Sequence, residues 1–353
     1  MFNLLKKIFM ERDNEGKKKD ENDDGTIIGN TGDQKFFTCD ALEKNRIVFF
    51  NNGFIRPCCR LINPIGYDVN EKTIKHELGG AFFISYDSFT FSTCEEVRKK
   101  NFIDFDRGVL GDCDGCPELR RTHKRSEGPL IGEIDFAFYS TCNLRCIFCP
   151  LGTWYHHPIS DYYDVVLRII TTLIQEKKID KMAIVTFSGG EPTLLPQLKS
   201  ICNIFQSYSN SITYTFFTNG VIFSDTIVDL IKSNEKTNIC ISLDSGSREG
   251  YFRIKGKDYF NAVIEHIRDY KKLIDQSVNG NSSFFLKFII VEENIDQIPL
   301  FIKLCKELGI NSVSYDVDFH IQRSDHINDA INLFNEIARE EMITCNYAGV
   351  GSR

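Results

Sequence analysis

From about residue 130, short continuous apolar runs alternate with longer segments whose apolar residues recur at helical spacing. A short continuous apolar run is typical of a strand buried on both faces of a parallel sheet, and the longer segments are typical of amphipathic helices. This alternation predicts an α/β fold with a parallel sheet. The predicted strands are Ile134–Thr141, Met182–Ser188, Ile212–Thr218, Ile239–Ser245, Phe284–Val291 and Val313–Phe319. The predicted helices are Asp164–Lys178, Leu194–Tyr208, Thr226–Ser233, Phe260–Ile274 and Gln297–Leu308.

The N-terminal stretch has a different composition. Residues 11–24 are almost wholly charged and polar and cannot bury a core, so we predict that residues 1–34 form a disordered polar tail. A membrane-surface helix over the first ten residues is the alternative. No run of 18 apolar residues occurs, so no transmembrane segment is expected. The net charge of −7 gives no electrostatic basis for binding nucleic acid.

Cysteine use narrows the chemistry further. The chain has 13 cysteines, an odd number, and no recognisable secretory signal. Such cysteines in a chain of this length indicate metal ligation rather than a disulfide framework, and a reducing, cytoplasmic location.

Three of these cysteines form a C-x3-C-x2-C triad at Cys142, Cys146 and Cys149. A cubane iron–sulfur cluster is closed by four thiolates, so three thiolates leave one iron open to another ligand. Three buried structural thiols are the simpler alternative.

The segment Thr-Cys-Asn-Leu-Arg-Cys-Ile-Phe-Cys-Pro around this triad resembles the radical S-adenosylmethionine (SAM) superfamily. In that family, the open iron of a [4Fe-4S] cluster binds SAM and its reductive cleavage releases a 5′-deoxyadenosyl radical. The resemblance implies a partial (β/α)6 TIM-like barrel over residues 130–322, followed by a C-terminal helix and tail over residues 323–353. In barrel enzymes the chemistry lies at the carboxyl ends of the strands.

Other motifs at the predicted strand ends extend the resemblance. The second strand leads into Gly189, Gly190 and Glu191, similar to the family's GGE motif, which binds the SAM amino group. The third strand leads into Asn219, similar to its TNG motif. Strand alternation places Ser242 and Asp244 on one face, where the family assigns hydrogen bonds to the ribose. The resemblance also implies that Arg253 meets the SAM carboxylate and that Phe148 lies against the adenine.

A second cysteine group precedes the barrel. Cys39 and Cys58 flank Gly53, and Cys113 and Cys116 form a C-x2-C knuckle. This pattern, over residues 35–125, resembles the SPASM or twitch domains that hold an auxiliary cluster, although those domains usually follow the barrel. A hairpin of residues 46–50 and 53–55 would bring Cys39 and Cys58 together. We expect one auxiliary [4Fe-4S] cluster in this small cysteine-rich domain.

Three points about the second cysteine group stay open. Cys59 is adjacent to Cys58 and could replace it as a ligand, and Cys94 is a reserve candidate. A structural zinc site with four cysteine ligands is the main alternative to a cluster.

The resemblance implies an enzyme that abstracts a hydrogen atom from a small polar molecule or a glycan precursor. A peptide-modifying maturase is one alternative, and a non-catalytic Fe–S or zinc protein is another. The electron donor would be a flavodoxin or a ferredoxin.

Overall fold

The computed structural model describes residues 35–58, 73–74, 83–110, 113–114, 116, 118–125, 128, 130–149, 162–233, 235–277, 282–318 and 324–347. The predicted tail, residues 1–34, lies outside these ranges. Residues 35–353 form one compact unit.

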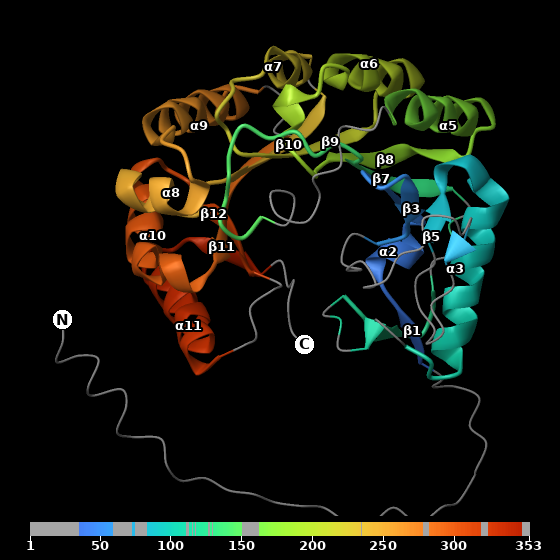
Figure 1. Ribbon diagram of the computed structural model, residues 1–353, viewed down its shortest axis with the longest axis horizontal. Helices are drawn as coiled ribbons and strands as arrows, with labels where there is room; N and C mark the ends of the chain where they lie inside the picture. Colours follow the sequence, from blue (N-terminus) through green and yellow to red (C-terminus); the bar gives the residue numbers. More distant parts are fainter. Residues whose placement is uncertain are drawn as a thin grey trace, which may run out of the picture. The chain divides into compact units, whose positions relative to one another are not determined.

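One large sheet organises this unit (Figure 1). Eight neighbouring strands are parallel, in the order β13-β12-β11-β10-β9-β8-β7-β2. Their bounds are β2 Arg46–Phe50, β7 Ile131–Ala137, β8 Ile179–Phe187, β9 Thr213–Thr218, β10 Lys236–Ser242, β11 Ser283–Ile290, β12 Ser312–Val317 and β13 Thr344–Tyr347. Within the described residues, no pairing joins β13 back to β2, so the barrel is open. The predicted α/β fold with a partial barrel is confirmed.

Helices cover the outer face of this arch (Figure 1). Apolar side chains that point outward from the strands form the core beneath them, and Phe187 and Phe216 on adjacent strands stack with ring centroids 5.0 Å apart. The helices are α5 Tyr163–Gln175, α6 Leu198–Tyr208, α7 Asp225–Lys232, α8 Arg248–Lys255, α9 Phe260–Asp275, α10 Ile298–Glu307 and α11 Asp325–Glu340, with the 3-10 helices η3 Pro192–Leu194 and η4 Glu292–Gln297.

The cysteine-rich segment adds to the same sheet. The predicted hairpin is formed by β2 and β3 (Phe54–Arg56), and β2 also pairs in parallel with β7. Strands β2, β3, β5 and β4, which lie in the predicted small cysteine-rich domain over residues 35–125, therefore share a sheet with the predicted core. The remaining elements are β1 Phe36–Thr38, α2 Asp40–Glu43, β4 Thr73–Ile74, β5 Phe83–Ser85, η1 Tyr86–Ser88, α3 Phe91–Asp106 and β6 Arg120–Thr122.

Candidate active site

The three-cysteine loop follows β7 and is held against the carboxyl end of α8. The N–H of Arg145 donates to the carbonyl of Lys255 at 3.0 Å, and the N–H of Ile147 donates to that of Ile254 at 3.0 Å. Gly256 ends α8 with a φ of +69°, and a Cβ there would lie 2.7 Å from the Arg145 carbonyl oxygen. A glycine is therefore required both for the helix end and for the close approach of the loop.

The three sulfur atoms lie in a shared electrostatic environment. The Sγ of Cys142 accepts from the N–H of Leu144 at 3.4 Å and from Nδ2 of Asn219 at 3.6 Å. Burial raises the pKa of Cys146 to about 11, against the lowering effect of the Lys255 ammonium. The negative charge of Asp244 and those of Cys149 and Cys142 contribute to this rise in pKa. In the metal-free chain Cys146 is therefore a protonated thiol at neutral pH, and metal binding must displace its proton.

The arrangement suits a cluster. Nowhere in the described ranges do three or more histidine, cysteine or acidic side chains converge as ligands of a single metal ion. A cubane binds each cysteine through a different iron, so it does not require the sulfurs to converge on one point. The loop supplies three such thiols next to the carboxyl ends of the strands.

The glycine pair predicted as a SAM contact packs against the start of this loop. A Cβ on Gly190 would lie 2.4 Å from the carbonyl oxygen of Thr141, and Gly189 has a φ of +86°. The N–H of Glu191 donates to the Thr141 carbonyl at 2.8 Å. The glycines therefore allow the end of β8 to lie directly on the cysteine loop.

Glu191 joins the ends of β8 and β9. Its buried carboxylate accepts from Oγ1 of Thr218 at 2.6 Å, from the N–H of Asn219 at 2.7 Å and from Oγ1 of Thr193 at 2.7 Å. Burial raises the pKa of Glu191, while these hydrogen bonds oppose the rise. Asn219 in turn donates through Nδ2 to Oδ1 of Asn143 at 2.7 Å, inside the cysteine loop. The GGE and TNG residues thus form one network with the loop.

The alternation that paired Ser242 with Asp244 ends before Asp244. Strand β10 stops at Ser242, which is half-buried, and Asp244 has a φ of +57°. The fully buried Asp244 carboxylate forms an ion pair with Lys255 and accepts from the N–H of Ile289 at 2.6 Å. Its predicted contact with the ribose stays a prediction.

Lys255 is a site residue that the sequence patterns did not indicate. Burial opposes its charge, but the Asp244 carboxylate raises the pKa of Lys255 well above the usual range. Its Nζ also lies 5.6 Å from the centroid of the Phe148 ring, in the cysteine loop. Lys255 therefore places a positive charge between Asp244 and the loop.

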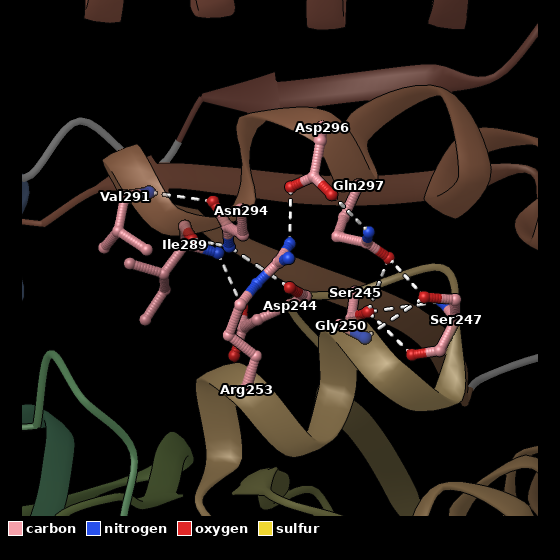
Figure 2. A network of polar contacts seen from close by, with 10 residues as sticks. All are labelled: Asp244, Ser245, Ser247, Gly250, Arg253, Ile289, Val291, Asn294, Asp296 and Gln297. Atoms are coloured by element: carbon pink, nitrogen blue, oxygen red, sulfur yellow. Dashed lines mark hydrogen bonds and ion pairs between the residues drawn. The ribbon is translucent and has the colours of Figure 1, made fainter.

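Arg253 lies on an exposed side of the same helix. Figure 2 shows its side chain turned to Asp296 of η4. The two charged groups are 2.5 Å apart, and 41% and 59% of their side chains are exposed. Beside this pair, Oε1 of Gln297 accepts from Oγ of Ser245 at 3.0 Å and from Oγ of Ser247 at 2.7 Å. These contacts fasten α8, and with it the cysteine loop, to the segment after β11. The predicted contact of Arg253 with SAM stays a prediction.

The second cysteine group is brought together in space. All four predicted ligands line one cavity of about 440 Å³: Cys39, Cys58, Cys113 and Cys116. The N–H of Cys116 donates to the carbonyl of Cys113 at 3.0 Å, which makes the tight turn expected of a C-x2-C knuckle. Burial raises the pKa of Cys39, and the charge of Cys116 adds to the rise.

The other candidates lie elsewhere. Cys94 is buried, donates to Oδ1 of Asn45 at 3.6 Å and does not line this cavity. Cys59 lies outside the described residues. Cys202, Cys240 and Cys305 are buried in the core region of the barrel.

Fold and site together define an open α/β barrel with a three-cysteine loop at the carboxyl ends of its strands. Residues 136–305 match the sequence profile of the radical SAM superfamily, so this part of the chain is a radical SAM domain.

The chain is also similar in part to known proteins. A probable GTP 3′,8-cyclase of Saccharolobus islandicus is 31% identical over 187 residues, 53% of this chain and 56% of the relative. A GTP 3′,8-cyclase of Chlorobaculum tepidum is 27% identical over 186 residues, 51% and 52% of the two chains. The chain thus spans about half the length of these relatives. The solved structure of Streptococcus suis SuiB bound to S-adenosylmethionine is 14% identical, with a TM-score of 0.48, over 73% of this chain and 58% of that one.

In the part of the chain that the structure describes, every helix is too short or too polar to cross a bilayer.

Proposed function

We propose that the protein is a radical SAM enzyme that abstracts a hydrogen atom from a small polar molecule or a glycan precursor. The observation that carries the proposal is the hydrogen-bonded network that joins the cysteine loop to the ends of β8 and β9 through Asn143, Glu191 and Asn219. It holds three thiols beside a glycine turn and a buried carboxylate, which suits a cluster with an open iron and a bound amino acid.

The residues of this chain have separable roles in the proposal. Cys142, Cys146 and Cys149 would hold a [4Fe-4S] cluster, which when bound with SAM supplies the 5′-deoxyadenosyl radical. Gly189, Gly190, Glu191, Asn219, Ser242, Arg253 and Phe148 would bind and orient SAM. Asp244 and Lys255 would position the loop through their buried ion pair. The abstracted hydrogen leaves as part of 5′-deoxyadenosine, and the substrate keeps the radical.

The second cysteine group supports an auxiliary centre. Cys39, Cys58, Cys113 and Cys116 would hold a second [4Fe-4S] cluster, with structural zinc as the alternative. Because their cavity also reaches the barrel interior, such a centre would face the substrate. Electrons would come from a flavodoxin or ferredoxin, since the low potentials of iron–sulfur clusters suit such donors.

The test is reductive SAM cleavage by the reconstituted protein under anaerobic conditions. We expect the wild type and Cys202→Ala, a buried cysteine remote from the motif, to form 5′-deoxyadenosine. Cys146→Ala should abolish it. Continued cleavage by Cys146→Ala would show that another centre carries the chemistry.

A further inference from the structure

The barrel interior contains a layer of polar side chains beside the second cysteine group. Asp135, Thr186 and Thr215 are register partners on β7, β8 and β9, and all three line the cavity that the four cysteines share. In a parallel barrel whose interior serves only as a core, bulky branched side chains fill such layers. One carboxylate and two hydroxyls around a cavity of about 440 Å³ are typical of a ligand site instead.

This layer lies near the cysteine loop. Phe217 of β9 lines the cavity, and Asn219, two residues further along, donates to Asn143 of the loop at 2.7 Å. Two residues of a strand span about 6.6 Å, so a ligand in the cavity can reach the loop side of the barrel. From that side, Oγ of Ser188 donates to Oδ1 of Asp135 at 2.7 Å.

The charged side chains that line the cavity indicate which class of ligand it can bind. Among the described lining residues, Asp40, Glu118, Glu133 and Asp135 are acidic and Arg46 is basic. Asp40 is already paired with Arg120, at 2.6 Å. The Arg46 guanidinium already contacts both oxygens of Glu133, at 2.8 and 2.9 Å. Phosphate groups are bound by arginine or lysine side chains that can turn to them. The lining therefore favours hydrogen-bond donors and positive charge over phosphate.

We propose that the barrel side of this cavity, lined by β7, β8 and β9, binds a non-phosphorylated polar substrate that presents ammonium or hydroxyl groups to Asp135, Thr186 and Thr215. The proposal rests on the proposed function, because it assigns the substrate class of the same barrel. It separates this protein from the GTP 3′,8-cyclases that its sequence resembles, whose named substrate carries a triphosphate.

Three matched sugars test the proposal on the reconstituted protein with SAM bound: glucosamine, glucose and glucose 6-phosphate. Calorimetry or ligand-observed NMR would give their dissociation constants. We expect glucosamine to bind most tightly. Glucose 6-phosphate should bind at least about tenfold more weakly than glucosamine, since its phosphate and the acidic lining repel each other in a partly buried site. Asp135→Asn should remove the preference of glucosamine over glucose, because it removes the charge and keeps the shape.

Two further variants control the measurement. Asp229→Asn makes the same change on the exposed face of α7 and should leave all three affinities unchanged. Thr186→Val removes a hydroxyl of the layer at nearly constant volume and should weaken glucose and glucosamine binding about equally, which keeps the test valid if Asp135→Asn misfolds.

The proposal is wrong if glucose 6-phosphate binds as tightly as glucosamine, if Asp135→Asn keeps the wild-type preference, or if none of the sugars binds at millimolar concentration. SAM cleavage in the same preparations separates the two claims. Cleavage without sugar preference overturns only the substrate class, whereas cleavage by Cys146→Ala overturns the proposed function.

Discussion

The Lys255 side chain stands at the point where the barrel meets the cysteine loop. Its ammonium is fully buried, pairs with Asp244 and lies near Cys146 and Phe148. Burying the two charges costs hydration free energy, and their mutual attraction offsets this cost only while both are present. The pair therefore links the position of α8 to that of the loop. Removing one partner should destabilise the fold much more than removing both.

We accordingly expect Lys255→Met to lower the free energy of unfolding of the metal-free chain by about 3–5 kcal/mol, because it leaves the Asp244 carboxylate buried without its cation. The double variant Lys255→Met with Asp244→Asn should recover much of that loss, since the asparagine Oδ1 can still accept from the N–H of Ile289. Urea unfolding of the four proteins in a double-mutant cycle measures the coupling. Additive effects would contradict the assigned pair.

The direction of the Lys255 pKa shift determines how the contribution of this pair to stability depends on pH. The pKa of Lys255 is raised in the fold, so its stabilising contribution is complete below the unfolded pKa of about 10.4 and is lost only as pH rises through the higher folded pKa. The stability difference between wild type and the double variant Lys255→Met with Asp244→Asn should therefore be constant from about pH 6 to 9. A difference that grows steadily as pH rises across that interval would mean that Lys255 is neutral in the fold, because the unfolded chain would then bind more protons.

At the scale of elements, the second cysteine group depends on short segments that are far apart in sequence. Helix α2 follows Cys39 directly, and β6 follows Cys116 after three residues. Arg120 of β6 joins them, contacting Asp40 and Glu43 of α2 at 2.6 Å each. The arginine thus holds the two halves of the cysteine group in register.

Arg120→Ala should therefore weaken metal retention at this group more than it weakens the fold. The side chains of Arg120 and Asp40 are 44% and 42% exposed, so we expect a stability loss below about 1 kcal/mol. Release of metal to a chelator should be about two- to fivefold faster, as follows from a local loss of that size. Arg248 of α8 forms a comparable exposed pair with Asp258, so Arg248→Ala is the matched control and should release metal at the wild-type rate.

The pH dependence of the Arg120–Asp40 pair gives a further test. Partial burial raises the pKa of Asp40, but the hydrogen bond from Arg120 outweighs burial and lowers that pKa below 3.8. Its contribution is therefore present above about pH 3.8 and is lost as pH falls through the folded pKa. The difference in metal release between wild type and Arg120→Ala should hold from pH 6 to 8; a strong change within that range would assign the effect to another group.

The sequence predicted most of the elements, for identifiable reasons. Strands β7 to β12 could be predicted because each contains a run of apolar and β-branched residues, whose outward-facing members pack beneath the helices. Strand β13 escaped prediction because Thr344–Tyr347 has no apolar run, and α8 because it is one short helix with a buried glycine and lysine. The end of β7 was placed too late, at Thr141, because the apolar Phe138 and Tyr139 are buried in the loop beyond the strand.

The site residues also divide into those that the sequence could reveal and those that only the fold could reveal. Cysteines and glycines stand out in a sequence because their spacing is set by local geometry, so the triad, the GGE turn and the C-x2-C knuckle could be found. Lys255 and Asp135 carry no such local pattern. Their importance comes from partners 11 and 53 residues away along the chain, Asp244 and Ser188, which only the fold brings near.

Over the whole molecule, one sheet connects both cysteine groups. Strand β2 extends the barrel next to β7, so the cavity of the second group is continuous with the barrel interior, lined by β7, β8 and β9. Under the proposed function, an auxiliary centre at this edge of the open barrel would lie on the substrate's side of the protein, where it would accept an electron or bind the substrate. A remote structural ion would have no need of that cavity.

Metal content of the anaerobically purified protein decides between these possibilities. We expect about eight iron and eight acid-labile sulfide per chain, as two cubanes require, and little zinc. Cys142→Ala with Cys146→Ala and Cys149→Ala should lower both counts to about four and leave a cluster spectrum from the second group. Replacing Cys113 and Cys116 should give the complementary loss while SAM cleavage continues, and Cys94→Ala should change nothing. Four iron with one zinc per chain would instead make the second group structural, leave the loop after β7 as the sole redox centre, and remove the auxiliary electron acceptor from the proposal.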